Sequence, residues 1–347
     1  MIETQLFKEI GEQGDALARL LDAESANVDR VAAAIHRAGI NYIMIAARGA
    51  SDNAATYGKY LFSAFNRLPV ALATPSLYTI YQMPPRLAGS LVIGISQSGE
   101  SPDILAVIEE AKRQKTLTLA VTNFGDSPLA RAADLVIQQH AGVEQTIAAT
   151  KTYTTQLLAL AMLSVALADD RVRQRETEAV PDAVTRTLAL NEIAEQAAAR
   201  WRAITACLVI GRGFNYATAF ETALKLKELA YVSAEPFSSA DFMHGPIAII
   251  QDAFPVIFVA PRGRVYEDLF QVARQLKEKG AEVLVISDAP DALALSSIPL
   301  TLPVPLPEWL SPLTAIIAGQ LLAYHLTAAK GYDPDHPRGL TKITRTL

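Results

Sequence analysis

The chain contains an internal repeat, and this repeat constrains the possible folds more than any other feature of the sequence. The run IMIAARG at residues 43–49 resembles CLVIGRG at residues 207–213, which begins 164 positions later. The same offset relates further residues, namely Gly99 to Gly263, Val121 to Val285 and Glu144 to Glu308. An offset this long exceeds the roughly 20–50 residues of a solenoid unit and indicates a duplicated domain.

Each half alternates short apolar runs with helical patterns. The runs that we expect to form strands are Tyr42–Ala46, Val70–Ala73, Leu91–Ile95, Thr118–Val121 and Leu135–Ile137, followed by Cys207–Ile210, Val256–Val259, Val283–Ile286 and Leu300–Leu302. Most are apolar throughout, which favours a parallel sheet covered on both faces. The predicted fold is α/β, with two tandem domains related by duplication, each a flavodoxin-like, doubly wound parallel sheet flanked by helices.

Changes in composition along the chain suggest where these domains begin and end. Apolar residues at helical spacing occupy the N-terminus, and the polar, helix-prone stretch Asp169–Glu178 ends just before Pro181. The predicted parts are an N-terminal helical segment at 1–40, a first domain at 41–180, a second domain at 181–330 and a C-terminal tail at 331–347.

Composition excludes some classes of partner. The formal net charge of −5 and the 19% of charged residues argue against broad electrostatic binding to nucleic acid or acidic membranes. The single cysteine, Cys207, lies in an apolar run and predicts a buried thiol without an internal disulfide. No leader pattern precedes the first helix, and the apolar stretch Leu157–Ala168 is shorter than the roughly 20 residues that span a bilayer. We expect a cytoplasmic protein.

A serine-rich loop follows the predicted strand Leu91–Ile95. Its sequence is Ser96-Gln97-Ser98-Gly99, and Ser101 and Pro102 then stand at the N-cap and first position of a helix. Hydroxyls, free backbone amides and the positive end of a helix dipole suit a phosphate monoester. The loop lacks the lysine of a Walker A motif. The second copy reads APRGRV at 260–265 and has lost these hydroxyls.

Ser51 belongs to the turn after the first strand, which we expect at the same edge of the sheet. The alternative for each of these serines is that it only caps a helix.

Glu221, Lys225 and Glu228 follow one another at helical spacing and therefore share one helix face. Together with His244, in the loop sequence His244-Gly245-Pro246, they could transfer protons. The alternatives are an exposed stripe of ion pairs and a structural histidine. No spacing of histidines and acidic residues suggests a metal site, and we expect no metal and no cofactor.

The tail at 331–347 shows neither a helical nor a strand period. It is either a frayed end or a lid that carries Lys342 to the site.

Together the motifs of this chain resemble those of a known family. They are ISQSGES at 95–101, TKTYTTQ at 150–156, ALKLKE at 223–228, HGP at 244–246 and the tail DHPRGLTK at 335–342. The chain is similar to the sugar-isomerase (SIS) family, and within it to the isomerase module of glucosamine-6-phosphate synthases and to stand-alone phosphosugar isomerases of the glucosamine-6-phosphate deaminase type. The resemblance extends over nearly the whole chain.

The resemblance implies a role for each matching residue. The residues implied to bind the sugar phosphate are Ser51, Ser96, Gln97, Ser98 and Ser101. Glu228 matches the base that moves a proton between C1 and C2, and Lys225 matches a lysine near it. His244 matches a ring-opening residue that a neighbouring subunit contributes, which implies a homodimer. Lys342 matches a tail lysine that engages the open-chain carbonyl.

The chain departs from the synthase pattern at two points. Ala149 replaces a serine before Thr150, and no catalytic cysteine follows Met1, so we expect no glutaminase domain. The function implied is deamination of a hexosamine 6-phosphate, most simply glucosamine 6-phosphate, to fructose 6-phosphate and ammonia.

Three alternatives remain. They are a deglycase of fructosamine-type adducts, an aldose–ketose isomerase of another 6-phosphosugar, and a non-catalytic sugar-phosphate sensor. Such sensors usually carry a DNA-binding helix-turn-helix, whereas residues 1–40 include Asp15, Asp22, Glu24 and Asp29, which suits packing rather than DNA contact.

Overall fold

The computed structural model describes residues 4–342, and these residues form two compact units. The unit that holds strands β1–β5 contains residues 15–145, 149–179 and 341–342. The unit that holds strands β6–β10 contains residues 4–14, 146–148 and 180–340. The chain passes between the units at residue 180, close to the boundary expected beside Pro181; the domain bounds themselves stay a prediction.

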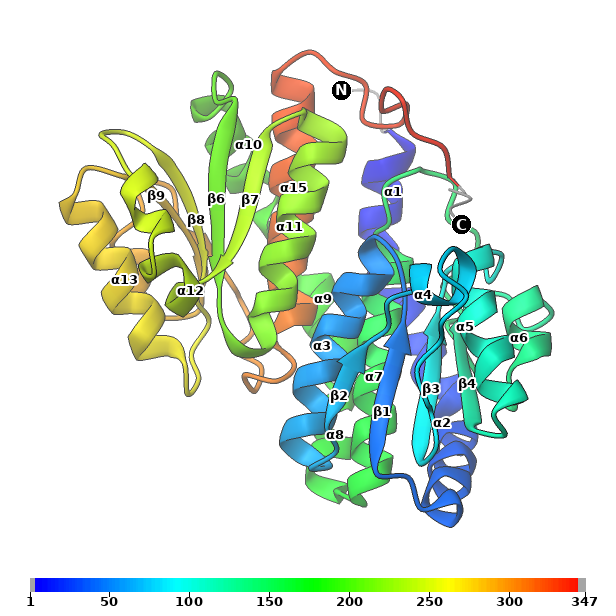
Figure 1. The fold of residues 1–347 in the computed structure, drawn as a ribbon. Helices are drawn as coiled ribbons and strands as arrows, with labels where there is room; N and C mark the ends of the chain where they lie inside the picture. Colours follow the sequence, from blue (N-terminus) through cyan, green and yellow to red (C-terminus); the bar gives the residue numbers. More distant parts are fainter. Residues whose placement is uncertain (1–3, 343–347) are drawn as a thin grey trace. The chain divides into compact units, whose positions relative to one another are not determined.

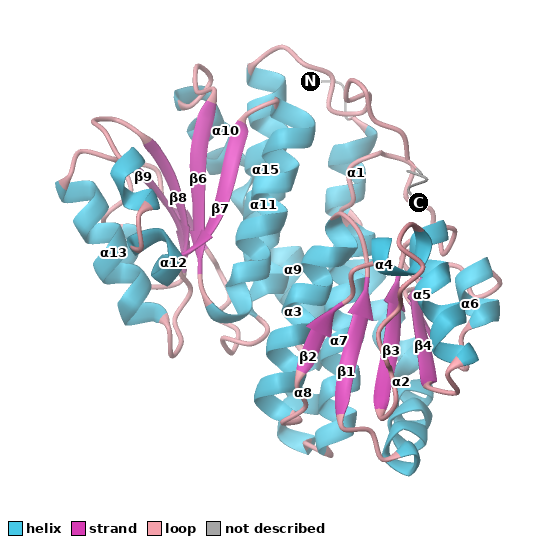
Figure 2. Cartoon of the chain, viewed as in Figure 1, coloured by secondary structure: helices cyan, strands magenta, loops and turns pink. Residues whose placement is uncertain are grey.

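Each unit contains a five-stranded parallel sheet (Figure 2). The first has the order β2-β1-β3-β4-β5, with β1 at Tyr42–Ala46, β2 at Val70–Leu72, β3 at Ser90–Ile95, β4 at Leu117–Thr122 and β5 at Leu135–Gln138. The second has the order β10-β9-β8-β6-β7, with β6 at Ala206–Gly211, β7 at Ser233–Ser238, β8 at Pro255–Val259, β9 at Glu282–Ser287 and β10 at Leu300–Thr301. Both are the doubly wound order 2-1-3-4-5 of flavodoxin-like folds. The predicted fold class and the duplication are therefore confirmed.

Helices separate most of the strands. Those up to residue 187 are α1 (Gln5–Gly11), α2 (Gln13–Ala38), α3 (Ala50–Phe65), α4 (Ser76–Thr79), α5 (Pro102–Arg113), α6 (Pro128–Ala132), α7 (Lys151–Ala168), α8 (Arg171–Glu178) and α9 (Val180–Thr187). The remaining ones are α10 (Asn191–Arg200), α11 (Tyr216–Ala230), α12 (Ser239–Met243), α13 (Tyr266–Glu278), α14 (Pro290–Leu293) and α15 (Ser311–Ala329). Short 3₁₀ turns lie at Leu188–Leu190, Gly213–Asn215 and Pro246–Ile249.

Apolar side chains on both faces of each sheet hold these helices in place. In the β1–β5 unit, Val92 and Ala120 pack against Ile104 and Ile108 of α5. In the β6–β10 unit, α13 packs on one face of the sheet, and α11 and α15 lie on the other side (Figure 1). The continuous apolar strands thus have the two-sided cover that their composition predicts.

Strand β7 was not expected from the sequence. Its residues, Ser233–Ser238, are mostly half-buried or exposed, and Pro236 interrupts the pattern. The strand lies at the edge of its sheet, beside β6. An edge strand can contain polar residues and a proline because one side of its backbone needs no partner. Apolar runs alone therefore miss it.

The longest weakly charged helix is α15 rather than the segment Leu157–Ala168. Helix α15 is long and apolar enough to cross a membrane, yet 89% of it is buried inside the protein. A core helix of a globular unit has the same properties.

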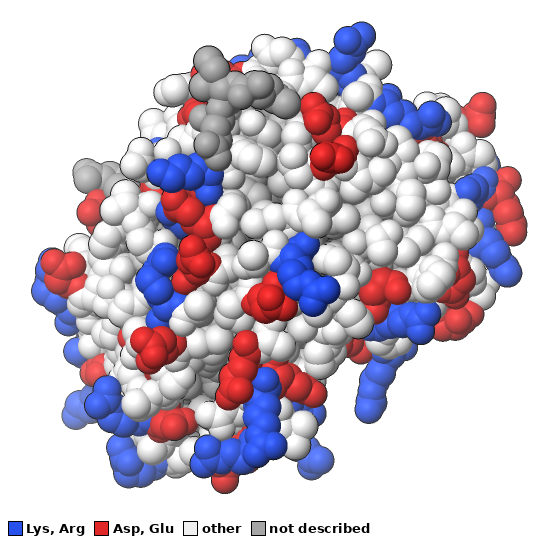
Figure 3. Space-filling view, turned by 180° about the vertical axis from the view of Figure 1, so that it is seen from behind, with Lys and Arg blue, Asp and Glu red and all other residues white. Residues whose placement is uncertain are grey.

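The surface carries both signs of charge, and the single cysteine lies in the core. On the face shown in Figure 3, basic and acidic side chains are interspersed. Cys207 is a free, buried cysteine in β6, and burial raises the pKa of its thiol to about 12. This is the buried thiol that the sequence predicts.

Candidate functional site

The serine loop connects the end of β3 to the start of α5 in the β1–β5 unit. Gly99 has a φ of 66°, and a Cβ at this position would lie 2.2 Å from Ser127 Oγ. Only glycine meets both conditions without strain. The turn is held against the neighbouring strand because Ser96 N donates to the Val121 carbonyl at 3.1 Å.

Hydroxyls and amides gather where this loop enters the helix. Gly99 N donates to Ser96 Oγ at 3.1 Å, and Glu100 N donates to Ser98 Oγ at 3.2 Å. Ser101 occupies the N-cap position, but its hydroxyl lies 3.3 Å from Ser96 Oγ instead of capping the helix. The loop therefore presents three hydroxyls at the positive end of a 12-residue helix, an arrangement that suits an oxyanion.

Ser51 lies in the first turn of α3, which follows β1. Because β1 and β3 are neighbouring parallel strands, both turns lie at the same edge of the sheet. Ser51 is buried, and its hydroxyl accepts a hydrogen bond from Gln156 Nε2 at 3.0 Å. Arg48, in the same turn, forms an ion pair of 2.7 Å with the fully buried Asp103 of α5. The two turns are thus joined by a charged contact. Gln97 is half-buried within the loop.

The three charged residues on α11 form one cluster in the β6–β10 unit. Lys225 Nζ lies 2.5 Å from Glu228 Oε2 and 3.3 Å from Glu221 Oε1. The side chains of Lys225 and Glu221 are 1% and 0% exposed, whereas that of Glu228 is 23% exposed. The alternative of an exposed ion-pair stripe is therefore wrong. The buried lysine holds one carboxylate inside the protein and a second that reaches the surface.

The electrostatics of this cluster favour a charged lysine. Burial acts to lower the pKa of Lys225, but the carboxylates of Glu228 and Glu221 outweigh burial, and the net pKa is raised. Lys225 therefore remains an ammonium ion between the two carboxylates.

His244 lies on a separate loop of the same unit. It ends α12, and it is exposed, as are Met243 and Gly245 on either side of it. Within residues 4–342, no hydrogen bond joins it to Glu228. An exposed histidine of this kind can act on a molecule that approaches from outside.

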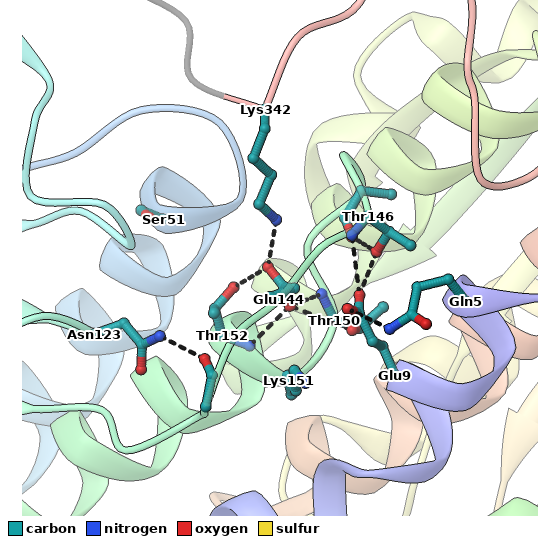
Figure 4. Close-up of polar contacts among 12 residues, drawn as sticks. Gln5, Glu9, Ser51, Asn123, Glu144, Thr146, Thr150, Lys151, Thr152 and Lys342 are labelled. Atoms are coloured by element: carbon teal, nitrogen blue, oxygen red, sulfur yellow. Dashed lines mark hydrogen bonds and ion pairs between the residues drawn. The ribbon is translucent and has the colours of Figure 1, made fainter.

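Lys342, in the tail, contacts the β1–β5 unit through a residue that sequence reasoning missed. Its Nζ lies 2.8 Å from Oε2 of Glu144, whose side chain is fully buried (Figure 4). Glu144 also accepts hydrogen bonds from the amides of Thr150 and Thr152, at 2.9 and 3.1 Å, and from the Thr152 hydroxyl at 2.7 Å. Burial acts to raise the pKa of Glu144, but Lys342 and these donors outweigh it and lower the pKa.

The rest of the tail is held within the β6–β10 unit. The carboxylate of Asp335 accepts hydrogen bonds from the amides of Gln5 and Leu6 at 2.9 and 2.8 Å. Arg338 stacks on the ring of Tyr231, at 3.9 Å, and its amide donates to the Tyr231 hydroxyl at 2.8 Å. Tyr231 directly follows α11, the helix that carries Glu228. The described part of the tail, as far as Lys342, is therefore docked rather than frayed.

The structure thus groups the predicted site residues by unit. Ser51, the serine loop and Lys342 belong to one unit, and Lys225, Glu228 and His244 belong to the other. Glu144, Thr150 and Thr152 join the first group. The repeat contained a signal for Glu144, because the 164-residue offset pairs it with Glu308. Among residues 4–342, no group of three or more histidine, cysteine or acidic side chains is arranged to hold a metal ion.

Known proteins share this architecture. The model of the SIS domain matches residues 38–166 and 204–330. The glutamine–fructose-6-phosphate aminotransferase (isomerizing) of Pyrococcus horikoshii is 36% identical over 343 residues, covering 97% of this chain and 57% of that relative. This chain therefore spans little more than half the length of the curated relatives that it matches.

Solved structures match over nearly the full chain. A proposed phosphosugar isomerase from Silicibacter pomeroyi has a TM-score of 0.87 at 33% identity, with 96% of this chain and 100% of that chain covered. The C-terminal domain of glucosamine-fructose-6-phosphate aminotransferase from Francisella tularensis has a TM-score of 0.87 at 28% identity, with 96% and 98% covered. Since both sheets lie within the matched segments and the relatives align over almost all of its residues, the chain belongs to the SIS domain family.

Proposed function

We propose that this protein is a phosphosugar isomerase that acts on a hexosamine 6-phosphate and converts glucosamine 6-phosphate and water to fructose 6-phosphate and ammonia. The observation that carries the proposal is the cluster on α11, where a buried ammonium ion supports a carboxylate that reaches the surface. A carboxylate in this setting can accept a proton from one carbon and return it to the next.

The reaction needs the phosphate to be fixed at one end of the sugar. We assign this task to Ser51 and to the loop residues Ser96, Gln97, Ser98 and Ser101. In the open chain, Glu228 removes the proton from C2, and the electrons form an enolamine as O1 accepts a proton. Glu228 then returns its proton to C1, which leaves an imine at C2. Water adds to this imine, and ammonia departs as the ketone of fructose 6-phosphate forms.

Lys342 and His244 are proposed to act on the sugar oxygens. The ammonium group of Lys342 donates to the carbonyl oxygen at C1 and stabilises the charge that develops there. His244 transfers a proton as the ring opens, a role that suits an imidazole near neutral pH. Lys225 keeps Glu228 in position through the 2.5 Å contact.

The reaction named for the curated relatives favours a substrate with nitrogen at C2. The curated relatives are named as glutamine–fructose-6-phosphate aminotransferases, and the one from Pyrococcus horikoshii is 36% identical over 97% of this chain. The same acid–base groups would interconvert an aldose and a ketose if C2 carried oxygen, and would cleave a fructosamine-type adduct if it carried a substituted nitrogen.

An assay with purified protein separates these reactions. Incubation with glucosamine 6-phosphate should release ammonia and fructose 6-phosphate in equal amounts. Conversion of glucose 6-phosphate without ammonia would identify the plain isomerase, and release of an amino acid from a 6-phosphorylated fructosamine would identify the deglycase. A melting temperature that rises with these sugars, without any turnover, would identify the sensor and contradict the proposal.

We also propose a cytoplasmic homodimer in which His244 completes the site of the neighbouring subunit. The exposure of His244 supports this assignment. Co-expression of Glu228→Gln with His244→Ala should then restore roughly a quarter of wild-type turnover, because half of the dimers are hybrids and each hybrid has one intact site. If both residues served the same subunit, the mixture would remain inactive.

A further inference from the structure

A glutamine in the interior of the β1–β5 unit contacts one of the residues assigned to the phosphate. Gln156 lies on α7 and is 1% exposed, and its Nε2 donates to the Ser51 hydroxyl at 3.0 Å. The two residues are 105 positions apart in the sequence. The reaction steps proposed above do not use Gln156.

Close packing of α3 on α7 brings the two side chains together. Gly58 stands about two helical turns after Ser51, and Leu160 stands about one turn after Gln156, so each pair shares a helix face. A Cβ on Gly58 would lie 3.2 Å from Leu160 Cδ1. Glycine at this position therefore allows the close approach of the helices that places the Gln156 amide against the Ser51 hydroxyl.

The amide of Gln156 is only half satisfied. Its Oε1 is buried and has no hydrogen-bond partner within residues 4–342. Proteins tolerate an unpaired buried carbonyl oxygen more often than an unpaired buried N–H group, which explains why the NH₂ end of the amide faces Ser51. The unpaired oxygen still lowers the stability of the interior, and an apolar side chain of the same shape would avoid this cost. A residue that weakens the core in this way is typical of a functional site.

The contact determines the direction of the Ser51 hydroxyl. Because the oxygen accepts from Gln156, its hydrogen is left for another acceptor, and in the described part of the chain it donates to none. Ser96 and Ser98 follow the same rule, since each hydroxyl accepts from a backbone amide of its own loop. The terminal oxygens of a phosphate monoester are acceptors, so hydroxyls that can donate match them.

The second copy of the repeat uses the equivalent glutamine differently. The 164-residue offset relates Gln156 to Gln320 on α15, and Ser51 to Asn215. Gln320 is equally buried, but its Oε1 accepts from Gln13 Nε2 at 2.6 Å. The side chain of Asn215 instead forms hydrogen bonds with two hydroxyls of its own unit. Donation from this glutamine to the turn therefore belongs to the copy that has the serine loop.

We propose that Gln156 is a positioning residue that makes the Ser51 hydroxyl a hydrogen-bond donor to the phosphate of the sugar. Gln156 does not touch the substrate. It occupies an acceptor position on Ser51 Oγ and so directs the hydroxyl hydrogen towards the anion. The inference rests on the assignment of Ser51 to the phosphate in the proposed function, and it does not depend on which reaction follows at C1 and C2.

Gln156→Met removes the amide and keeps the approximate length of the side chain. The probe is glucitol 6-phosphate, an open-chain 6-phosphosugar that cannot react because it has no carbonyl group. Its dissociation constant, measured by calorimetry, should rise about tenfold, since a hydrogen bond to a charged group is weakened. The melting temperature of the ligand-free variant should not fall, because the unpaired Oε1 is removed with the amide. Gln320→Met is the matched control, and it should leave the dissociation constant unchanged.

A lower melting temperature of Gln156→Met with an unchanged dissociation constant would show that the amide serves only the fold, and would overturn the proposal. A double-mutant cycle gives the second measurement. Ser51→Ala alone should weaken binding, and Gln156→Met should cause no further loss in that background; independent losses would also overturn the proposal. Equal binding by the wild type and Ser51→Ala would refute the assignment of Ser51 and this inference with it. Absence of turnover with glucosamine 6-phosphate, with these binding results as expected, would refute only the proposed reaction.

Discussion

Replacement of Glu228 by glutamine should reduce turnover of the sugar phosphate by roughly 10²–10⁴-fold, the usual contribution of a positioned acid–base group. Glutamine keeps the size of the side chain but cannot accept the proton from C2. The serine loop is untouched by this change, so binding of the substrate should be largely kept. The measurement is kcat by coupled release of fructose 6-phosphate, together with the dissociation constant of the sugar phosphate from calorimetry.

Glu221→Gln is the matched control for this experiment. Both changes remove a carboxylate beside Lys225, but Glu221 is fully buried and Glu228 is 23% exposed. Glu221→Gln should lower the melting temperature at least as much, because it removes a charge partner from the interior. Its turnover per folded molecule should fall much less. If Glu228→Gln kept turnover within about tenfold of the wild type, the assignment of the base would be wrong.

The internal repeat predicts one strand that the apolar runs miss. Strand β2 at Val70–Leu72, shifted by 164 positions, falls inside β7 at Ser233–Ser238. Apolar runs identify strands that are covered on both faces, and the polar β7 at the sheet edge gave no such signal. The position of its counterpart in the first copy would have predicted it.

Parts of the candidate site could be predicted where the residues involved lie close together in the sequence, but not where they lie far apart. The serine loop could be placed from its sequence because a strand, a glycine turn and a helix start follow one another within a dozen residues. The repeat offset marks Glu144 itself, but its contact with Lys342 could not be predicted, since the two residues lie 198 positions apart. The spacing of Glu221 and Lys225 predicted a shared face but not its burial, because α11 packs against α15, an element distant in the sequence. The approach of that helix is close, because a Cβ on Gly319 would lie 2.4 Å from Thr222 Oγ1.

Replacement of Glu144 by glutamine should lower kcat/KM by about 10–100-fold, although Glu144 itself is a positioning residue that acts through Lys342. A hydrogen bond to a charged group contributes roughly 1.5–3 kcal/mol, and this change removes the charge that holds the tail lysine at 2.8 Å. Digestion by trypsin after Arg338 and Lys342, followed by mass spectrometry, should show faster cleavage in the variant. A role confined to the fold would not change the tail in this way.

A double-mutant cycle decides whether the effect of Glu144 passes through Lys342. In a Lys342→Met background, Glu144→Gln should cause little further loss of kcat/KM, because the lysine that it positions is already gone. Thr152→Val is the matched control: it removes the 2.7 Å hydroxyl donor to the same carboxylate but leaves the ion pair with the tail. It should affect the melting temperature more than kcat/KM. If Glu144→Gln lowered kcat/KM equally in both backgrounds, Glu144 would act through the start of α7 and not through the tail.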